Sequence, residues 1–476
     1  MKNNIQKFIS GEKTFLIAPA GYGKTYTLAE CILDTPENEK QLILTHTHAG
    51  IASIKEKLKN RNIPTRKYHI ETITGFAQRY VLAYYCENDI PAIERDTGSY
   101  YNFIIKKAKE LFQLKSVKRT IMYSYQGLFV DEYQDCTKSQ HEMLMVLSEI
   151  LPTHILGDPM QGIFGFSEPL VDLENDLKDF EKVDELDTPW RWNNASKNSL
   201  GKDLKDIRNK LKAELPISLN SYKSFETVLC NNNDWYKPRT NYRNTLEDLL
   251  LENNLLLIHP ISSSIEPRIK ILQSFNNRLS LLESFDAKEF YKLSLMIDKW
   301  DNEGKSISLL VRDLSYKLFI KKGLNNWFNK NGLKRKSKED DKKKIAEIQE
   351  LIDRFKVKSS YSMFALIIKK INKLQGIKCY RKDLLFSLCK ALNIAETENK
   401  TVYEAMVSHK NVVRRVGREI HGKCIGTTLL TKGLEFDTVA ILNANKFKDH
   451  KHFYVAITRA CKRLIIFSEK EVLKFY

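Results

Sequence analysis

The chain has 476 residues, which is too long for one hydrophobic core and predicts about three structural units. It carries 77 Lys and Arg against 59 Asp and Glu, and its formal net charge of +18 favours a polyanionic partner such as DNA or RNA, unless the whole proteome is basic. No apolar stretch approaches the about 20 residues of a membrane span, and the start lacks the apolar core of a signal peptide, so we expect a cytoplasmic protein with no membrane partner. The eight cysteines form no Cys-x-x-Cys pair, which indicates neither a zinc site nor a disulfide framework.

The first predicted strand, residues 15–17, runs into a loop of mostly small residues and then into a helix that continues from Tyr26. A strand, a glycine-rich loop and a helix in this order typically hold the phosphates of a nucleotide, because backbone N–H groups point at the phosphates. In such a loop Lys24 reaches the outer two phosphates and the Thr25 hydroxyl can bind Mg²⁺. A plain glycine-rich turn is the alternative interpretation. The loop consists of Ala18, Pro19, Ala20, Gly21, Tyr22, Gly23, Lys24 and Thr25.

Further short apolar runs alternate with helix-like segments along the chain. Residues 42–44, 128–130 and 155–156 continue the first series, and each ends in a polar or small residue, as buried parallel strands do. A second series begins near Leu186. It includes residues 255–258, 439–442 and 464–467. The helix-rich segments 78–120 and 283–422 predict insertions, and the charged run 334–344 is either a solvated segment or a phosphate contact.

Two adjacent carboxylates follow the apolar run 128–130. Asp131 can hold Mg²⁺, usually through water, and Glu132 can take a proton from an attacking water molecule. An acidic helix cap after a strand is the alternative, but the position of these residues about one hundred residues after the phosphate loop, with strands between, favours the catalytic interpretation.

The segment 131–135, followed by Gln140, resembles the second motif of UvrD/PcrA/Rep-type superfamily-one DNA helicases, and other motifs follow in family order. The similar segments are 45–58 (motif Ia), 72–77 (Ib), 157–166 (III), 189–192 (IV), 427–436 (V) and 454–460 (VI). The resemblance implies an α/β fold with two RecA-like P-loop domains, each a parallel sheet flanked by helices, and two helical insertions. The implied bounds are 1–77 and 121–183 for core 1A, which binds ATP, 78–120 for insertion 1B, 184–282 and 423–476 for core 2A, and 283–422 for insertion 2B.

The same resemblance implies an ATP and Mg²⁺ site in the cleft between the cores. Gln161 would sense the γ-phosphate, and Arg191 and Arg459 would neutralise charge on it in the transition state, although surface salt bridges are the alternative for these arginines. Lys24 and Glu132 complete the implied catalytic set, and Asp131 and Thr25 the metal set. The other implied nucleotide contacts are Gln6 at the adenine, Glu435 at the ribose and Gly433. Trp190 and Tyr26 are two aromatic residues that could stack on the base.

On the nucleic-acid side, Phe166 occupies the position of the family's base-stacking Trp, with Phe164 close by. A buried core Phe is the alternative for both residues. Several positions depart from the family pattern, since His46 replaces a Phe, Thr74 a His and Leu429 a His. We therefore expect ATP hydrolysis to be better kept than translocation and unwinding. The implied DNA-binding residues are Thr45, His46, Thr72, Phe164, Phe166 and Thr427.

The resemblance leads to two functional hypotheses. The first is a DNA-dependent ATPase that translocates 3′ to 5′ on single-stranded DNA. Duplex unwinding is the activity that the departures from the family pattern make less expected. The second is a nucleotide- or DNA-end-sensing ATPase subunit that regulates a partner OLD-family ATPase-nuclease, because the proportions of the chain resemble the UvrD-like B subunit of Gabija anti-phage systems.

Overall fold

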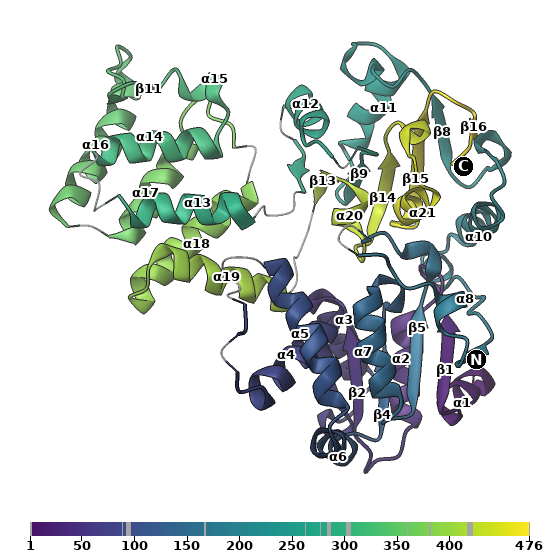
Figure 1. Cartoon of the computed structure of the whole chain (residues 1–476). Coiled ribbons are helices and arrows are strands. Elements are labelled where there is room, and N and C mark those ends of the chain that lie inside the picture. The colour runs from purple at the N-terminus through teal and green to yellow at the C-terminus, as the bar shows by residue number, and fades with distance from the viewer. Residues whose placement is uncertain are drawn as a thin grey trace.

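The computed structural model describes residues 2–87, 89–91, 97–165, 168–261, 263–276, 278–282, 287–300, 306–358, 360–379, 382–416 and 422–475. They form two parallel six-stranded sheets and one helical unit, which lies to the left of both sheets in Figure 1. The predicted fold class, two RecA-like domains with parallel sheets flanked by helices, is confirmed. No helix among these residues is both long and apolar enough to cross a membrane.

The first sheet is parallel throughout and is built from strands whose two faces are both covered by helices. Phe15 and Ile17 of β1 face a cluster with α4 to α7, whereas Leu16 faces a second cluster with α1 to α3. Successive side chains of a strand point to opposite faces, so an uninterrupted apolar run is what a sheet covered on both sides requires. The strand order is β3 (Tyr68–Thr72), β2 (Gln41–Thr45), β4 (Gly127–Val130), β5 (Thr153–Gly157), β1 (Lys13–Ile17) and β6 (Glu181–Val183).

Seven helices flank this sheet: α1 (Lys2–Ser10), α2 (Lys24–Asp34), α3 (His48–Asn60), α4 (Ile73–Tyr84), α5 (Thr97–Phe112), α6 (Lys115–Ser124) and α7 (Lys138–Ser148). Residues 78–120, the expected insertion 1B, contribute Tyr80, Ile104 and Phe112 to the same apolar cluster as the sheet. The described part of this segment therefore packs into the first core, because its apolar side chains are buried against α7 and the strands.

The second sheet repeats this plan with strands from both sides of the helical unit. Its order is β10 (Ser280–Leu281), β13 (Lys423–Gly426), β9 (Leu255–Ile258), β14 (Phe436–Ile441), β15 (Ala460–Ser468) and β8 (Glu226–Leu229), all parallel. Helices α10 (Asn198–Lys212) and α21 (His450–Ile457) cover one face, and α11 (Asn241–Leu249) and α12 (Glu266–Ser274) the other. The second series of apolar runs was expected to begin near Leu186, but Leu186 itself lies in no strand. Leu186 lies in the segment 184–188, here called the hinge segment, which leaves the first sheet after β6 and bonds from the Leu186 N–H to the Ile17 carbonyl.

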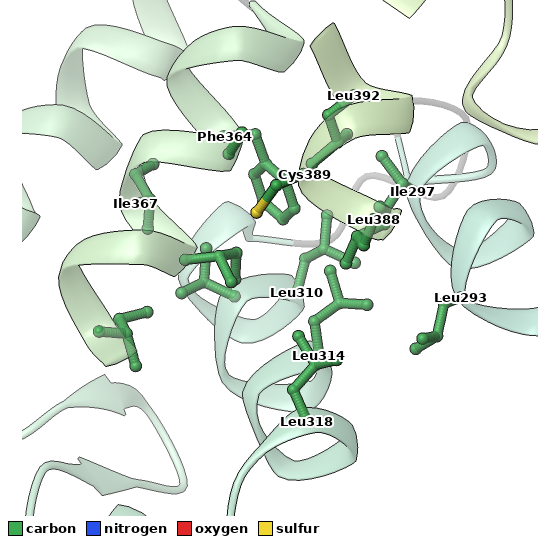
Figure 2. Packing of buried hydrophobic residues seen from close by; sticks show 14 of the residues in the cluster. Leu293, Ile297, Leu310, Leu314, Leu318, Phe364, Ile367, Leu388, Cys389 and Leu392 are labelled. Atoms are coloured by element: carbon green, nitrogen blue, oxygen red, sulfur yellow. The ribbon is translucent and has the colours of Figure 1, made fainter. Parts of the chain in front are cut away.

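The helical unit has a hydrophobic core of its own, shown in Figure 2. Leu310, Leu314 and Leu318 recur every four residues on one helix, and Phe364 and Leu388 approach from two others. Such spacing gives a helix one apolar face. The helices are α13 (Ala287–Asp298), α14 (Ile307–Leu318), α15 (Lys321–Leu324), α16 (Glu339–Val357), α17 (Tyr361–Asn372), α18 (Lys382–Glu398) and α19 (Val402–Val416), with the hairpin β11 (Phe328–Asn329) and β12 (Gly332–Leu333).

Helix α19 packs against α3, so the helical unit, which is inserted in the chain of the second unit, contacts the first unit. The remaining short elements are η1 (Thr65–Lys67), η2 (Tyr133–Asp135), η3 (Pro159–Gln161), α8 (Leu173–Asp176), α9 (Trp190–Asn194), β7 (Ile217–Ser218), η4 (Leu219–Ser221), η5 (Asp234–Tyr236), α20 (Thr428–Thr431), η6 (Ala444–Lys446) and β16 (Val472–Leu473).

Candidate functional site

The phosphate loop lies between β1 and α2, where the sequence predicts it. Gly21 and Gly23 have φ values of +79° and +86°, in the left-handed region that favours glycine. A Cβ on Gly21 would come 2.9 Å from the ring of Trp192, which belongs to the second unit. Glycine is therefore required at position 21 by the backbone conformation and by the close approach of the second unit.

Lys24, at the start of α2, is paired with both carboxylates that follow β4. Its ammonium lies 2.9 Å from Oδ1 of Asp131 and 2.5 Å from Oε1 of Glu132. Burial by itself would lower the pKa of Lys24, but the two carboxylates hold it above its ordinary value. For Glu132, burial alone would raise the pKa, and Lys24 and Lys432 nevertheless lower it to about 2. The loop lysine and the two motif II carboxylates thus form one charge cluster.

Two details fix Glu132 in this cluster. Its backbone has a φ of +56°, a left-handed conformation that is uncommon for a residue with a side chain. The side-chain amide of Gln134 donates to the Glu132 carboxylate, and its Oε1 accepts from the Asp158 N–H at 2.9 Å. Gln134 therefore connects the carboxylate after β4 to the backbone after β5. Backbone strain of this kind is found at functional sites.

The donor set fits Mg²⁺ held mainly by a bound nucleotide. Thr25 and Asp131 offer oxygen atoms, which Mg²⁺ prefers, and Mg²⁺ commonly takes only one or two carboxylates while phosphates and water supply the rest. Within the described residues, no group of three or more His, Cys, Asp or Glu side chains could hold a metal by itself. The residues therefore suit a metal that arrives with phosphate groups.

A buried network around Asp158 joins the two units. Asp158 is fully buried at the end of β5, and its carboxylate accepts from Gln161 at 2.9 Å, from Arg208 at 3.2 Å and from the Tyr454 hydroxyl at 3.3 Å. The Tyr454 hydroxyl also accepts from the N–H of Ala20 in the phosphate loop, at 3.2 Å. The loop is thus bonded to α21 of the second unit, and Asp158 is bonded to both α10 and α21.

The two predicted arginine fingers lie against this network. The Arg191 N–H donates to the Gly21 carbonyl at 2.9 Å, and its guanidinium pairs with Glu435 at 2.6 Å. Arg459 is buried and donates to Oε1 of Gln161 at 3.3 Å. Burial, together with the nearby charge of Arg191, lowers the pKa of Arg459 to about 10. The structure therefore brings the arginines, the phosphate loop and Gln161 together at one interface.

Lys432 makes contacts that the sequence motifs did not predict. Its ammonium lies 2.6 and 2.7 Å from the two carboxylate oxygens of Asp135, donates to the Gln161 carbonyl, and lies 4.9 Å from the ring centroid of Phe164. Its position directly before Gly433 in motif V is the signal that could have drawn attention to it. Arg208 was also missed, and it lies outside the motif segments quoted above.

Some predicted nucleotide contacts lie apart from this cluster. Gln6 is exposed, and its amide donates to Asp34 at 3.2 Å. The guanidinium of Arg61 lies over the ring of Tyr26, at 4.5 Å from the ring centroid. Trp190 is 42 % exposed and lies beside Gly23, where an added Cβ would come 3.2 Å from the indole ring. Trp190 therefore packs against the phosphate loop from the second unit.

Comparisons with known proteins find similarity to helicases. The family described as AAA domain matches residues 2–167, and the family described as viral superfamily 1 RNA helicase core domain matches residues 337–468. The chain is 23% identical to the Gabija protein GajB of Bacillus cereus (strain VD045), over 98% of this chain and 95% of that protein. Together these similarities support a superfamily-one helicase.

Another curated relative matches only part of this chain, and the solved structures share less sequence with it. An ATP-dependent helicase/nuclease of Lactococcus lactis subsp. lactis (strain IL1403) has one subunit that is 25% identical over 34% of this chain and 14% of its own length. Among solved structures, the Pif1 helicase from Candida albicans gives a TM-score of 0.40 at 11% identity, covering 99% of this chain and 94% of that one. A helicase of PRRSV gives 0.37 at 10% identity, covering 98% of this chain and 54% of that one.

The residues predicted to contact DNA differ in exposure. Phe164 is 36% exposed beside Lys432, whereas Thr45 and Thr427 are buried. The Thr72 hydroxyl accepts from the Gly75 N–H at 3.0 Å and caps α4.

Two further predicted DNA contacts are His46 and Phe166. The Nε2 atom of His46 lies 3.3 Å from Sγ of Cys136, and burial lowers the pKa of His46 to about 4, so that the ring is neutral. Phe166 lies outside the described residues. Of the two aromatic residues predicted to stack on DNA, the structure therefore describes Phe164, and the roles of all these side chains stay predictions.

Proposed function

We propose that the protein is a DNA-dependent ATPase that translocates 3′ to 5′ on single-stranded DNA. The observation that supports it best is the contact between Arg191 of the second unit and Gly21 of the phosphate loop. A nucleotide held by the loop would touch residues of both units at once, so its binding and hydrolysis would change how the units fit together.

In the hydrolysis step, the protein residues exchange partners. Bound Mg²⁺ would neutralise phosphate charge and hold oxygen atoms in line. Lys24 moves from the motif II carboxylates to the outer phosphates, and the pKa of Glu132 then rises because it loses its nearest cation. Glu132 accepts the proton of the attacking water, while Arg191 and Arg459 stabilise the charge that develops on the transferred group.

The link from hydrolysis to DNA runs through motif III and motif V. Gln161 contacts Arg459 through its side chain and Lys432 through its carbonyl, and Lys432 lies beside the exposed ring of Phe164. Aromatic rings bind successive bases by stacking without reading their sequence. A change at the γ-phosphate side would therefore shift the ring on which a base stacks.

The test is the rate of phosphate release with and without single-stranded DNA, using Lys24→Ala as the control without turnover. We expect DNA to raise the rate and a streptavidin block on the 5′ end to be displaced faster than one on the 3′ end. An ATPase rate that ignores DNA over a range of lengths and salt concentrations would contradict the proposal.

The second candidate is an ATPase subunit that senses nucleotide or DNA ends and regulates a partner OLD-family nuclease in anti-phage defence. It is favoured by the similarity to GajB, which extends along nearly all of both chains. The engaged hydroxyl of Thr72 and the buried Thr427 also fit weak unwinding. Co-expression with an OLD-family nuclease, followed by size-exclusion chromatography and nuclease assays with and without ATP, tests it. Processive unwinding of long duplex by the isolated chain would argue against it.

A further inference from the structure

Arg208 on α10 binds two acidic residues that belong to different parts of the molecule. One nitrogen of its guanidinium lies 3.2 Å from Oδ1 of Asp158, directly after β5 in the first unit. Another lies 2.5 Å from Oε1 of Glu185 in the hinge segment. The Arg208 side chain is only 6% exposed. Because a guanidinium is planar and rigid, it holds these two carboxylates in a fixed arrangement.

The hinge segment is the chain connection between the two sheets. Every strand of the first sheet precedes it, and every strand of the second sheet follows it. On one side the Leu186 N–H donates to the Ile17 carbonyl of β1. On the other side α10 is bonded to the segment through Arg208 and through the Lys205 ammonium, which donates to the Asp187 carbonyl at 3.3 Å. A rotation between the units is absorbed by a few connecting residues, so it must change this segment or its contacts.

Asp158 connects Arg208 to the residue predicted to sense the γ-phosphate. Oδ2 of Asp158 accepts from the Gln161 amide at 2.9 Å, and Oε1 of Gln161 accepts from Arg459 at 3.3 Å. A buried carboxylate is stable when it is paired and hydrogen-bonded, and Arg208 supplies the positive charge for Asp158. Gln161, Asp158, Arg208 and Glu185 therefore form one bonded path from the predicted γ-phosphate side to the hinge segment.

We propose that Arg208 is a positioning residue that couples Gln161 to the hinge segment, so that the presence of the γ-phosphate sets the relative orientation of the two units. The inference rests on the proposed ATPase function and adds the route by which the nucleotide acts on the connection between the units. Arg208 lies outside the motif segments quoted above, and its contacts alone indicate this role.

Trp190 provides the readout, because it lies two residues after the hinge segment and packs against Gly23 of the phosphate loop. The measured quantity is the difference in tryptophan fluorescence between the protein with ADP and the protein with the non-hydrolysable analogue AMP-PNP. The two ligands share a base and differ at the γ-phosphate. The chain has five tryptophans, so Trp190→Phe identifies the part of the difference that comes from Trp190.

Glu185→Gln removes the charge of the hinge partner and leaves Arg208 paired with Asp158. We expect it to reduce the fluorescence difference by about threefold or more, while the affinity for each nucleotide stays within about twofold. Arg208→Met, which loses both pairs, should lower kcat about tenfold with little change in KM, as expected when an interaction is lost mainly in the transition state. Arg243→Met is the matched control, because Arg243 is a partly buried arginine that bonds to Glu247 and Ser274 on the opposite face of the second sheet.

An unchanged fluorescence difference in Glu185→Gln would overturn the inference. So would the absence of any difference in the unaltered protein when both nucleotides bind, and so would equal losses of kcat in Arg208→Met and Arg243→Met, since the effect would then follow from lost stability. The proposed function fails separately, if DNA does not raise the rate of ATP hydrolysis, whatever the fluorescence shows. If the unaltered protein binds no nucleotide, both fail together.

Discussion

Replacing Lys432 by Met removes one partner of the buried ion pair that joins the two units. The side chains of Lys432 and Asp135 are only 8% and 5% exposed, and the ammonium lies 2.6 Å from one carboxylate oxygen. Breaking a buried pair on one side leaves an unpaired charge and typically lowers the free energy of unfolding by about 3–5 kcal/mol. Met keeps most of the side-chain volume, so this loss is mainly electrostatic.

The lone carboxylate can lower that penalty by taking up a proton. Even with Lys432 present, burial raises the pKa of Asp135 from 3.8 to about 6. Protonating a group of pKa 3.8 at pH 7 requires about 4 kcal/mol, which is an upper limit on the loss from this group at that pH. Because the folded-state pKa lies above the unfolded value, the charged form destabilises the fold as pH rises through this window. The deficit of the variant should therefore be larger at pH 8 than at pH 5.5.

Urea unfolding at the two pH values measures this deficit. The control is the double variant Lys432→Met with Asp135→Asn, which removes both charges and should recover part of the lost stability. A single variant that loses less than about 1 kcal/mol at pH 8, or a double variant that loses the sum of the two single losses, would refute the reasoning, because either result would mean that the pair contributes no coupling.

Two further predictions concern stability and the interface. Burial lowers the pKa of His154 to about 4, below its unfolded value of 6.5, so the free energy of unfolding should fall as the pH drops, by about 2 kcal/mol at pH 5. In His154→Phe, the free energies of unfolding measured in urea at pH 7 and pH 5 should therefore lie closer together than in the unaltered protein. The same gap in both proteins would contradict this cause. Gly21→Ala should abolish ATPase activity and lower the melting temperature, because a Cβ would meet the Trp192 ring at 2.9 Å. Gly376→Ala is the control, since Gly376 has a similar φ of +81° but nothing within 4 Å of an added Cβ, and it should lower the melting temperature less. Equal losses of melting temperature in the two variants would show that the close approach to Trp192 is unimportant.

Much of the fold follows from the sequence because its central strands are continuous apolar runs. Residues 255–258 and 128–130 become strands covered on both faces, and the lengths of such runs and the residues that follow them indicate parallel sheets. The edge strands β3 and β8 were not predicted. Their side chains are mostly exposed or half-buried, so no apolar run marks them, and they form because a neighbouring strand offers unpaired backbone groups.

The site shows the same division. Lys24, Asp131 and Glu132 are recognisable because a glycine-rich loop and an acidic strand end require particular residues at fixed spacings, and the structure joins them in one cluster. Gln6 and Tyr26 were expected at the base, but their described contacts are with Asp34 and Arg61. An exposed side chain can contact any of several neighbouring residues, and the tertiary structure decides which one lies within reach. A sequence pattern therefore does not predict that contact.

The sequence by itself determined the phosphate loop, the motif II carboxylates and the positions of the central strands along the chain, since these depend on residues close together in the chain. Only the tertiary structure decided that Lys432 pairs with Asp135 across 297 positions and that Arg208 joins Asp158. The same holds for the pairing of Arg208 with Glu185 in the hinge segment. The physical reason is that local conformation is set by neighbouring residues, whereas a buried charge or hydroxyl acquires its partner only when two separately built sheets pack together.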